Sequence, residues 1–300
     1  MIKVLANDGV ESKAKEELER LGIEVLDIHY DNESLKDEIK NFDVILVRSA
    51  TKIRRDIIDK ALENKKLKLI IRCGVGLDNI DANYAREKGI DVFNTPCASS
   101  VSVAEMVLAH IFSLAKFLNQ SNVTMKQGKW NKKEYVGIEV LNKTIGILGM
   151  GRIGKELALR AKALGVNVIY YDILGKVSEM YGEFKEFDYV LKNSNFLSIN
   201  ISGDKVIIGR DEIKKMRKDS FLINCSRGNI IDEGALLDAL NNGDILGAGL
   251  DVFSNEPTKN TELLNCKNVS LSPHIGASTK EAQEKIGKEI ISIVKNKFNL

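Results

Sequence analysis

The chain has 300 residues, of which 44% are hydrophobic and 29% are charged, a composition typical of a folded globular protein. Its 44 Lys and Arg residues nearly balance its 42 Asp and Glu residues, so neither nucleic acid nor an acidic membrane is expected as the main partner. A single hydrophobic core rarely extends past about 250–300 residues, so the length favours two domains.

The first residues, MIKVLAND, are typical of a β-strand and lack the charged region, apolar core and cleavage site of a signal peptide. The longest apolar stretch, residues 101–118, is interrupted by charged and polar side chains and falls short of the ~20 apolar residues of a membrane-spanning helix. The four cysteines are widely separated, which indicates neither a disulfide framework nor a metal site. These features predict a cytoplasmic protein without a metal.

The first third of the chain alternates short apolar segments with helical ones. Strands are predicted near residues 2–6, 23–28, 43–48, 67–72 and 90–93. Helices are predicted near residues 12–21, 33–40, 54–63 and 81–88. Short strands that alternate with helices indicate βαβ units and a mostly parallel sheet.

A long helix near residues 100–118 and a polar stretch precede a second series of strands. These strands are predicted near residues 143–149, 166–171, 196–200, 220–224, 246–250 and 268–272. A last helix is expected at 280–298, where isoleucine and valine recur at helical spacing, and it could pack on either domain. The pattern predicts an α/β fold of two doubly wound, Rossmann-like parallel-sheet domains.

The sequence GMGRIG follows the first strand of the second series and precedes a helical pattern. It places Gly149, Gly151 and Gly154 in GxGxxG spacing, which allows a tight turn, a close backbone approach to a pyrophosphate and close helix–strand packing. Asp172 ends the next predicted strand, near the ~20-residue distance expected for an acidic residue that binds the adenosine ribose. Its carboxylate would repel a 2′-phosphate, so we predict NAD rather than NADP; the alternative is a glycine turn in another doubly wound fold.

Polar residues follow three successive strands of the second domain, at the sheet edge where α/β proteins bind ligands. They are Arg227, Asp251 with Glu256, and His274. A histidine can take a proton from an alcohol and return it, a nearby carboxylate orients the imidazole, and an arginine suits a substrate carboxylate or carbonyl oxygen. Beside a nicotinamide, these groups are suited to oxidising an alcohol.

Each of these residues also has an ordinary structural interpretation. Arg227 alone is typical of a surface ion pair, Glu256 of a turn, and His274 of a hydrogen-bonded loop. Their shared placement at successive strand ends, in the domain with the glycine motif, favours the catalytic interpretation. The other two histidines differ, because His29 is expected to be exposed and His110 to lie in the core of an apolar helix.

Four motifs, GMGRIG, NCSRGNIIDEGAL, GAGLDVFSNEP and SPHIGAST, resemble those of the D-isomer-specific 2-hydroxyacid dehydrogenase family in order and spacing. The resemblance covers essentially the whole chain and implies that Arg227, Glu256 and His274 are catalytic. It implies that Arg152 and Ile153 contact the cofactor phosphates and that Asp251 contacts the nicotinamide amide. The full set of implied cofactor-binding residues is Gly149, Gly151, Arg152, Ile153, Gly154, Asp172, Cys225, Asp251, His274 and Gly276.

In the N-terminal domain, VRSATKI, IIRCGVGLDNID and NTPCASSVSVAE resemble most closely the family members that oxidise 3-phospho-D-glycerate. The substrate-binding residues that this resemblance implies are Arg48, Ser49 and Ser99 at the phosphate, the backbone amides of Gly74, Val75 and Gly76 at the carboxylate, and Arg227. The chemistry agrees, because a glycine-flanked turn of amides binds anions and an arginine beside a hydroxyl suits phosphate. The ordinary interpretation of Arg48 is a solvated residue at a strand end.

The resemblance implies a discontinuous substrate-binding domain formed by residues 1–99 and 275–300, and an NAD-binding domain formed by residues 100–274. Two crossovers between the domains imply closure around the substrate. Ser278 or Thr279 is expected to cap the returning helix. Family members pair their NAD-binding domains, so a homodimer is expected.

Two departures from the family pattern modify these expectations. The loop at residues 200–211 is shorter than usual and lacks a proline, so no cofactor contact is assigned there. The chain ends at Leu300 without the amino-acid-binding regulatory domain of longer relatives, so feedback inhibition by serine is not expected.

The function implied is oxidation of 3-phospho-D-glycerate to 3-phosphooxypyruvate with NAD, the first step towards serine. The nearest alternative is an NADH-dependent reductase of an unphosphorylated 2-oxo acid such as glyoxylate, hydroxypyruvate or pyruvate. A dinucleotide-sensing scaffold that resembles transcriptional corepressors is a further alternative, and it would bind NADH without reducing 2-oxo acids.

Overall fold

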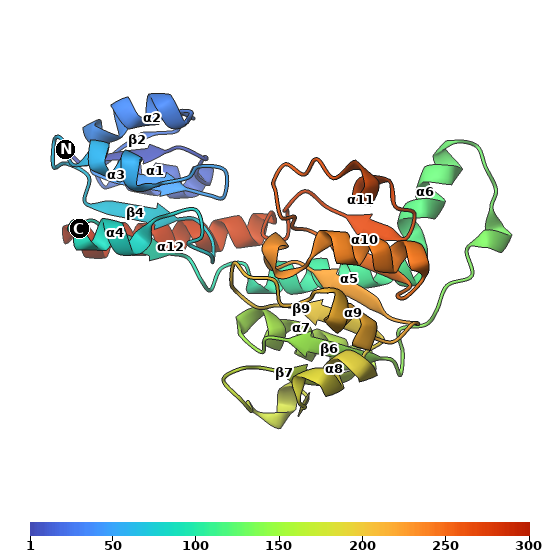
Figure 1. The fold of residues 1–300 in the computed structure, drawn as a ribbon. Helices are drawn as coiled ribbons and strands as arrows, with labels where there is room; N and C mark the ends of the chain where they lie inside the picture. The colour runs from blue at the N-terminus through green and yellow to red at the C-terminus, as the bar shows by residue number, and fades with distance from the viewer. The chain divides into compact units, whose positions relative to one another are not determined.

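The computed structural model describes residues 1–300 and divides them into two compact units (Figure 1). Unit 1 contains Met1–Ser99 and Ala277–Leu300, and unit 2 contains Ser100–Gly276. Each unit is built on a parallel β-sheet. The predicted fold class is therefore confirmed, including a first unit assembled from both ends of the chain.

Unit 1 contains a five-stranded sheet in the order β2-β1-β3-β4-β5. Its strands are β1 (Lys3–Ala6), β2 (Glu24–Leu26), β3 (Val44–Val47), β4 (Leu69–Arg72) and β5 (Asp91–Asn94). Its helices are α1 (Ser12–Arg20), α2 (Asn32–Glu38), α3 (Arg55–Ala61), α4 (Ala82–Glu87) and α12 (Lys280–Phe298). All residues of β3 are buried, as expected for a central parallel strand covered by helices on both faces.

The last helix, α12, packs in unit 1, as the family resemblance implied, whereas its helical spacing alone was compatible with either domain. Its buried face includes Ile286, Ile290 and Val294, which join the apolar cluster of the N-terminal segment. Figure 1 shows this helix in red beside the blue elements. The helix begins after Thr279, whose hydroxyl accepts a hydrogen bond from the Ala282 amide at 3.3 Å, as the capping prediction required.

Unit 2 contains a seven-stranded sheet in the order β12-β11-β10-β9-β6-β7-β8. Its strands are β6 (Thr144–Leu148), β7 (Asn167–Tyr171), β8 (Glu183–Phe184), β9 (Phe196–Ile199), β10 (Phe221–Asn224), β11 (Gly247–Leu250) and β12 (Val269–Leu271). Its α-helices are α5 (Ser100–Ala115), α6 (Leu118–Lys126), α7 (Arg152–Ala163), α8 (Phe187–Asn193), α9 (Arg210–Lys215), α10 (Glu233–Asn242) and α11 (Thr261–Asn265). The strand order reverses between β6 and β9, where doubly wound sheets bind their ligands.

Six strands of unit 2 end at the same level of the sheet. Their last residues lie in one row of paired positions: Tyr171, Leu148, Ile199, Asn224, Leu250 and Leu271. The residues that directly follow this row include four of the predicted site residues, Asp172, Gly149, Cys225 and Asp251. The register of the sheet therefore brings residues from distant parts of the chain to one edge.

The helix expected at residues 100–118 is shorter in the structure, because α5 ends at Ala115 and α6 begins at Leu118. Phe117 has a φ of 54°, in the left-handed region, and cannot continue a right-handed helix. The Ile138 amide donates to the Ala115 carbonyl at 2.9 Å and so provides a partner for the end of α5. No single helix is long and apolar enough to cross a membrane; α5 and α6 are so only when taken together, across a 64° bend.

Candidate functional site

The three glycines of the GxGxxG motif lie between β6 and α7. Gly149 has a φ of 93°, and a Cβ on it would lie 2.7 Å from the Asn200 carbonyl oxygen. A Cβ on Gly154 would lie 2.3 Å from the Gly149 carbonyl oxygen, whereas a Cβ on Gly151 would meet no atom within 4 Å. The first and third glycines thus allow close packing, and open space lies beside the second, at the N-terminus of α7, as a bound pyrophosphate requires.

Asp172 is the first residue after β7 and is tied to the glycine loop. Its Oδ2 accepts a hydrogen bond from the Met150 amide at 2.7 Å, and its Oδ1 accepts one from the Leu174 amide at 2.8 Å. The carboxylate is therefore held beside the loop, in the place expected for a group that binds the adenosine ribose. Nearby, Arg152 is exposed and Ile153 is half-buried in the first turn of α7.

His274 and Glu256 form the closest pair of ionisable groups at this edge of the unit 2 sheet. His274 Nδ1 lies 2.7 Å from Glu256 Oε2, and Glu256 Oε1 accepts from the Phe253 amide at 3.1 Å. Burial by itself raises the pKa of the Glu256 carboxyl, but the hydrogen bond and charge of His274 outweigh this effect and the pKa lies below its ordinary value. Glu256 is therefore ionised at neutral pH and leaves Nε2 as the ring nitrogen that can exchange a proton with a ligand.

Asp251 holds the turn that carries His274. Its Oδ1 accepts from the Ile275 amide at 2.8 Å and its Oδ2 from the Gly276 amide at 2.7 Å. The Asp251 side chain is buried, with the residue only 1% exposed. His274 has a φ of 54°, a conformation that is costly for a residue with a Cβ and persists only where surrounding contacts enforce it.

Arg227 follows β10 and lies near Glu256. A Cβ on the next residue, Gly228, would lie 1.9 Å from the Phe253 carbonyl, so the two loops are in direct backbone contact. The Arg227 Nη1 donates to the Ser226 carbonyl at 2.7 Å, and its charge contributes to the lowered pKa of Glu256. The structure therefore brings together the three residues predicted to be catalytic.

Cys225 directly follows β10 and is buried. Burial raises the pKa of its thiol well above the ordinary value, and the Asp251 carboxylate acts in the same direction. Such a thiol is not a reactive nucleophile. Within residues 1–300 there is also no group of three His, Cys, Asp or Glu side chains that could hold a metal ion.

In unit 1, Arg48 is the first residue after β3, where the strand order reverses between β1 and β3. Its backbone amide donates to Asp8 Oδ2 at 2.6 Å, and its carbonyl accepts from Asn79 Nδ2 at 2.6 Å. The same Asp8 and Asn79 side chains also bind Thr51. The turn that carries Arg48 is therefore fixed at both ends.

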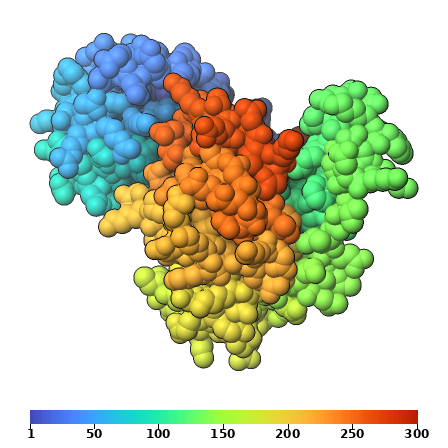
Figure 2. Space-filling model, turned by 45° about the vertical axis from the view of Figure 1, so that its right-hand side comes forward, coloured from blue at the N-terminus to red at the C-terminus, as the bar shows by residue number.

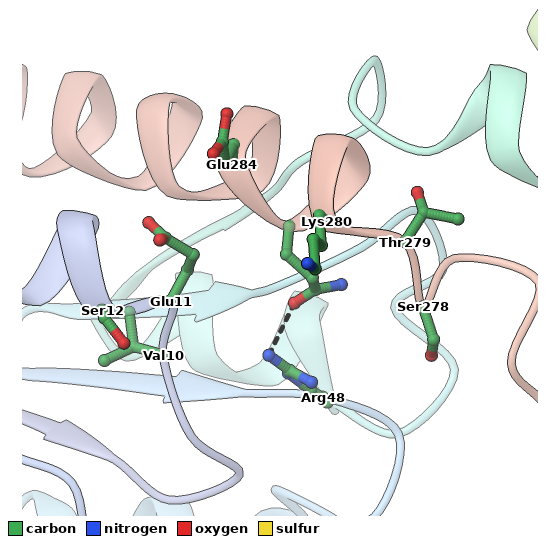
Figure 3. Close-up of a pocket in the computed structure, with 9 residues that line it drawn as sticks. Val10, Glu11, Ser12, Arg48, Ser278, Thr279, Lys280 and Glu284 are labelled. Atoms are coloured by element: carbon green, nitrogen blue, oxygen red, sulfur yellow. Dashed lines mark hydrogen bonds between the residues drawn. The ribbon is translucent and has the colours of Figure 1, made fainter.

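The Arg48 guanidinium lies at a cavity of about 460 Å³ beside the first turn of α12 (Figure 3). Its Nη2 donates to Gln283 Oε1 at 2.6 Å, whereas its buried Nε has no hydrogen-bond partner. Lys280 also lines the cavity. Two carboxylates, Glu11 and Glu284, line it as well and are labelled in Figure 3. Glu284 forms an ion pair with Lys13 at 2.6 Å. The carboxylates disfavour an anion on their side of the cavity, so the end near Arg48 is the part suited to an anion.

The predicted amide turn of Gly74, Val75 and Gly76 follows β4. Gly74 has a φ of 149°, and its amide donates to the Arg72 carbonyl at 2.9 Å. A Cβ on Gly74 would lie 1.5 Å from Arg72 Nη1, so the guanidinium lies against this turn. The Gly74 amide is engaged within the turn, which leaves Val75 and Gly76 as its predicted anion donors. Ser49 is exposed and Ser99 is buried; their roles stay predictions.

Residues 108–276 match the model of the D-isomer specific 2-hydroxyacid dehydrogenase family, NAD binding domain. The chain belongs to this family. It is 42% identical to the D-3-phosphoglycerate dehydrogenase of Methanocaldococcus jannaschii, over 98% of this chain and 57% of that protein. It is 40% identical to the hydroxypyruvate reductase of Thermotoga maritima, over 96% of both chains.

A solved structure of a 2-hydroxyacid dehydrogenase agrees with this assignment. The D-lactate dehydrogenase from Aquifex aeolicus, in complex with NAD and lactic acid, has a TM-score of 0.86 at 28% identity, over 99% of this chain and 95% of that one. The chain spans about half the length of the phosphoglycerate dehydrogenase that it matches. Unit 2, Ser100–Gly276, therefore contains the residues that match the NAD binding domain of this family.

Sequence reasoning missed several residues that position the predicted groups. Asp8 and Asn79 fix the turn of Arg48, Gln283 binds its guanidinium, and Arg72 lies against the Gly74 turn. Asp8 could have been predicted from the sequence, because it is a polar residue just after β1, where the strand order reverses. Gln283 lies inside a regular helix and carries no comparable signal.

Asp172 is expected to make this chain prefer NAD over NADP. In Asp172→Ala, the preference for NAD over NADP should fall by about tenfold or more, because the carboxylate no longer binds the ribose hydroxyls or repels a 2′-phosphate. The measurement is kcat/KM for each coenzyme. Asp188→Ala, which removes an exposed aspartate of α8, is the matched control, and an unchanged preference in Asp172→Ala would contradict the assignment.

Proposed function

We propose that this protein is an NAD-dependent dehydrogenase that oxidises 3-phospho-D-glycerate to 3-phosphooxypyruvate. The observation that carries the dehydrogenase chemistry is the 2.7 Å hydrogen bond between His274 and Glu256, beside Arg227 and on the sheet of the NAD-binding domain. Relatives with this substrate in their names and the cavity at Arg48 support the substrate.

When bound, NAD supplies the nicotinamide ring that accepts a hydride from the substrate carbon. His274 Nε2 takes the proton of the substrate hydroxyl, and the Glu256 carboxylate orients the ring and stabilises its positive charge. Arg227 binds the substrate carboxylate and the oxygen that becomes a carbonyl. In the reverse direction, the imidazolium returns its proton to that oxygen.

Arg48 is the proposed ligand of the substrate phosphate, with Ser49, Ser99 and Lys280 as further candidates. Support comes from its partnerless buried Nε and from the anion-suited end of the cavity. Val75 and Gly76 amides are the proposed partners of the substrate carboxylate. A cationic fork of this kind binds phosphate by charge-assisted hydrogen bonds.

Reduction of unphosphorylated hydroxypyruvate or glyoxylate is the second candidate function. It is favoured by the full-length match to the Thermotoga maritima hydroxypyruvate reductase and by the engagement of Arg48 Nη2 with Gln283. Both candidates use the same acid–base groups of unit 2, so only the groups of unit 1 separate them.

The Arg48→Ala variant tests the choice between these substrates. Its kcat/KM is expected to fall about 10- to 100-fold more for 3-phosphooxypyruvate than for glyoxylate, because only the first loses a charge-assisted hydrogen bond. NADH oxidation is followed with both substrates, and Arg20→Ala, which removes an exposed arginine of α1, is the control. Equal losses for both substrates would contradict the phosphate assignment and favour the reductase.

A homodimer formed through unit 2 is also proposed. In Figures 1 and 2, the green segment that contains α6 stands out from the rest of this unit. It exposes several apolar side chains, among them Leu118, Met125, Val136 and Trp130, the last 77% exposed. Apolar groups exposed together in this way are typical of a protein interface.

Sedimentation velocity of Trp130→Asp tests the dimer. The buried charge should shift the protein from dimer to monomer at micromolar concentration. Leu264→Asp, a substitution at an exposed leucine of α11, should leave the dimer intact. A wild-type protein that sediments as a monomer would contradict the proposal.

A further inference from the structure

His110 is a buried histidine of α5 that the proposed reaction does not use. It is only 4% exposed, yet both ring nitrogens have partners. Nδ1 lies 2.9 Å from Ser270 Oγ, and Nε2 lies 3.1 Å from Ser272 Oγ. A Cβ on Gly249 of β11 would lie 2.7 Å from His110 Cβ, so this glycine allows the helix to approach the sheet closely.

The direction of each hydrogen bond around His110 can be assigned by starting from Asp251, at one end of the chain of hydrogen bonds. Ser272 Oγ donates to Asp251 Oδ1 at 2.6 Å. A hydroxyl has a single proton and an ionised carboxylate only accepts, so Ser272 Oγ must accept the bond from His110. His110 Nε2 therefore carries a proton. The other neighbour of this hydroxyl, Met106 Sδ at 3.9 Å, is a weak acceptor that does not compete with a carboxylate.

The remaining directions follow from the same reasoning. A neutral imidazole with a proton on Nε2 accepts at Nδ1, so the Ser270 hydroxyl donates to His110. Ser270 Oγ in turn accepts from Asn119 Nδ2 at 3.0 Å. All hydrogen bonds then point one way, from Asn119 in α6 through Ser270, His110 and Ser272 to Asp251.

The neutral form of His110 suits this chain of hydrogen bonds. Burial lowers the pKa of His110 below its ordinary value, although the Asp251 charge acts in the opposite direction. A second proton, on Nδ1, would force Ser270 to reverse its hydroxyl. Bonds that all point one way strengthen one another in a low-dielectric interior.

Asp251 at the end of the chain is the residue that holds the Ile275 and Gly276 amides. We propose that His110 is a positioning residue for His274: as the neutral Nε2–H tautomer it directs the Ser272 hydroxyl onto Asp251, which keeps the His274 turn in its positive-φ conformation. The role assigned to His274 rests on the proposed function; the tautomer of His110 does not.

The tautomer is tested first, on the full chain labelled with ¹⁵N-histidine. The spectrum of wild-type protein at about pH 7.5, with the His110 signals identified by their loss in His110→Gln, should show a neutral ring protonated on Nε2. A ring protonated on Nδ1, or on both nitrogens, would overturn the proposal. This measurement needs no turnover, so it remains valid if the protein reduces no 2-oxo acid, a result that would instead contradict the proposed function.

The positioning role is tested by the kinetics of Ser272→Ala and His110→Leu. Each should lower kcat about tenfold, the effect of one lost hydrogen bond to a charged group, while KM for NADH changes little. His110→Gln should recover part of the loss, because its amide can still donate to Ser272. Ser113→Ala, which removes a buried hydroxyl without a partner from the same helix, is the control and should keep the wild-type kcat.

A double variant, His110→Leu with Ser272→Ala, distinguishes two explanations of the lower kcat: loss of one connected chain of hydrogen bonds, or two independent local defects. If His110 and Ser272 act through one path, His110→Leu with Ser272→Ala should have about the kcat of the slower single variant. Multiplied losses, or a wild-type kcat in Ser272→Ala, would overturn the proposal. If His110→Leu does not fold, the comparison of His110→Gln, Ser272→Ala and Ser113→Ala still decides it.

Discussion

His274→Asn is expected to lower kcat by about 10²- to 10⁴-fold, the typical contribution of a general acid–base. Asparagine is among the residues that best tolerate a positive φ, and its amide can still donate to Glu256, so the turn should keep its shape. It cannot take up or release a proton in the neutral range. The loss should therefore appear in kcat, with NADH binding retained.

NADH fluorescence gives the binding constant, and NADH oxidation with a series of 2-oxo acids gives kcat. Glu256→Gln is the informative comparison, because it keeps a side chain of similar size next to His274 but removes the charge that stabilises the imidazolium. We expect its loss to be smaller than that of His274→Asn. Turnover of His274→Asn within about threefold of wild type would remove this residue from the acid–base role.

Arg227→Gln is expected to lower kcat/KM by about 10²- to 10³-fold, as for other groups that stabilise charge developing on a substrate oxygen. The guanidinium is proposed to bind both the carboxylate and the reacting oxygen, and glutamine offers neither its charge nor its fork. Because the oxygen gains charge during the reaction, the loss should be divided between KM and kcat rather than confined to KM.

Arg227→Lys should retain part of the activity, since it keeps the charge but loses the paired donors. The control is Arg210→Gln. Arg210 is an exposed arginine at the start of α9, and it forms an ion pair with Asp238. Thermal unfolding of each variant shows whether the fold is intact. A kcat/KM for Arg227→Gln equal to that of the control would exclude an anchoring role.

The fold, and the residues that lie at the candidate site, were predictable because parallel strands have clear sequence patterns. Strands covered on both faces are continuous apolar runs, and ligand-binding residues directly follow them. Arg227, Asp251 and His274 follow β10, β11 and β12, which are neighbours in the sheet as well as in the chain. Local patterns were therefore sufficient to bring these residues to one edge.

Contacts between distant segments were not predictable in the same way. Nothing near Arg48 indicates that Gln283, far along the chain, binds its guanidinium. The end of α5 was missed because Phe117, an ordinary helix residue, adopts a left-handed conformation that only its surroundings impose. His110 was interpreted as a core residue, and its burial agrees, but its polar partners come from β12 and the residue after it.

At His274, the positive φ that costs folding free energy coincides with the proposed acid–base role. A glycine would adopt this backbone conformation at no steric cost, whereas a residue with a Cβ there costs of order 1–3 kcal/mol. Selection for thermal stability alone is therefore expected to favour replacement of the imidazole to which we assign the proton transfer. A programme that engineers a more heat-resistant form of this protein should therefore exclude position 274 from its library and measure the turnover of the selected variants.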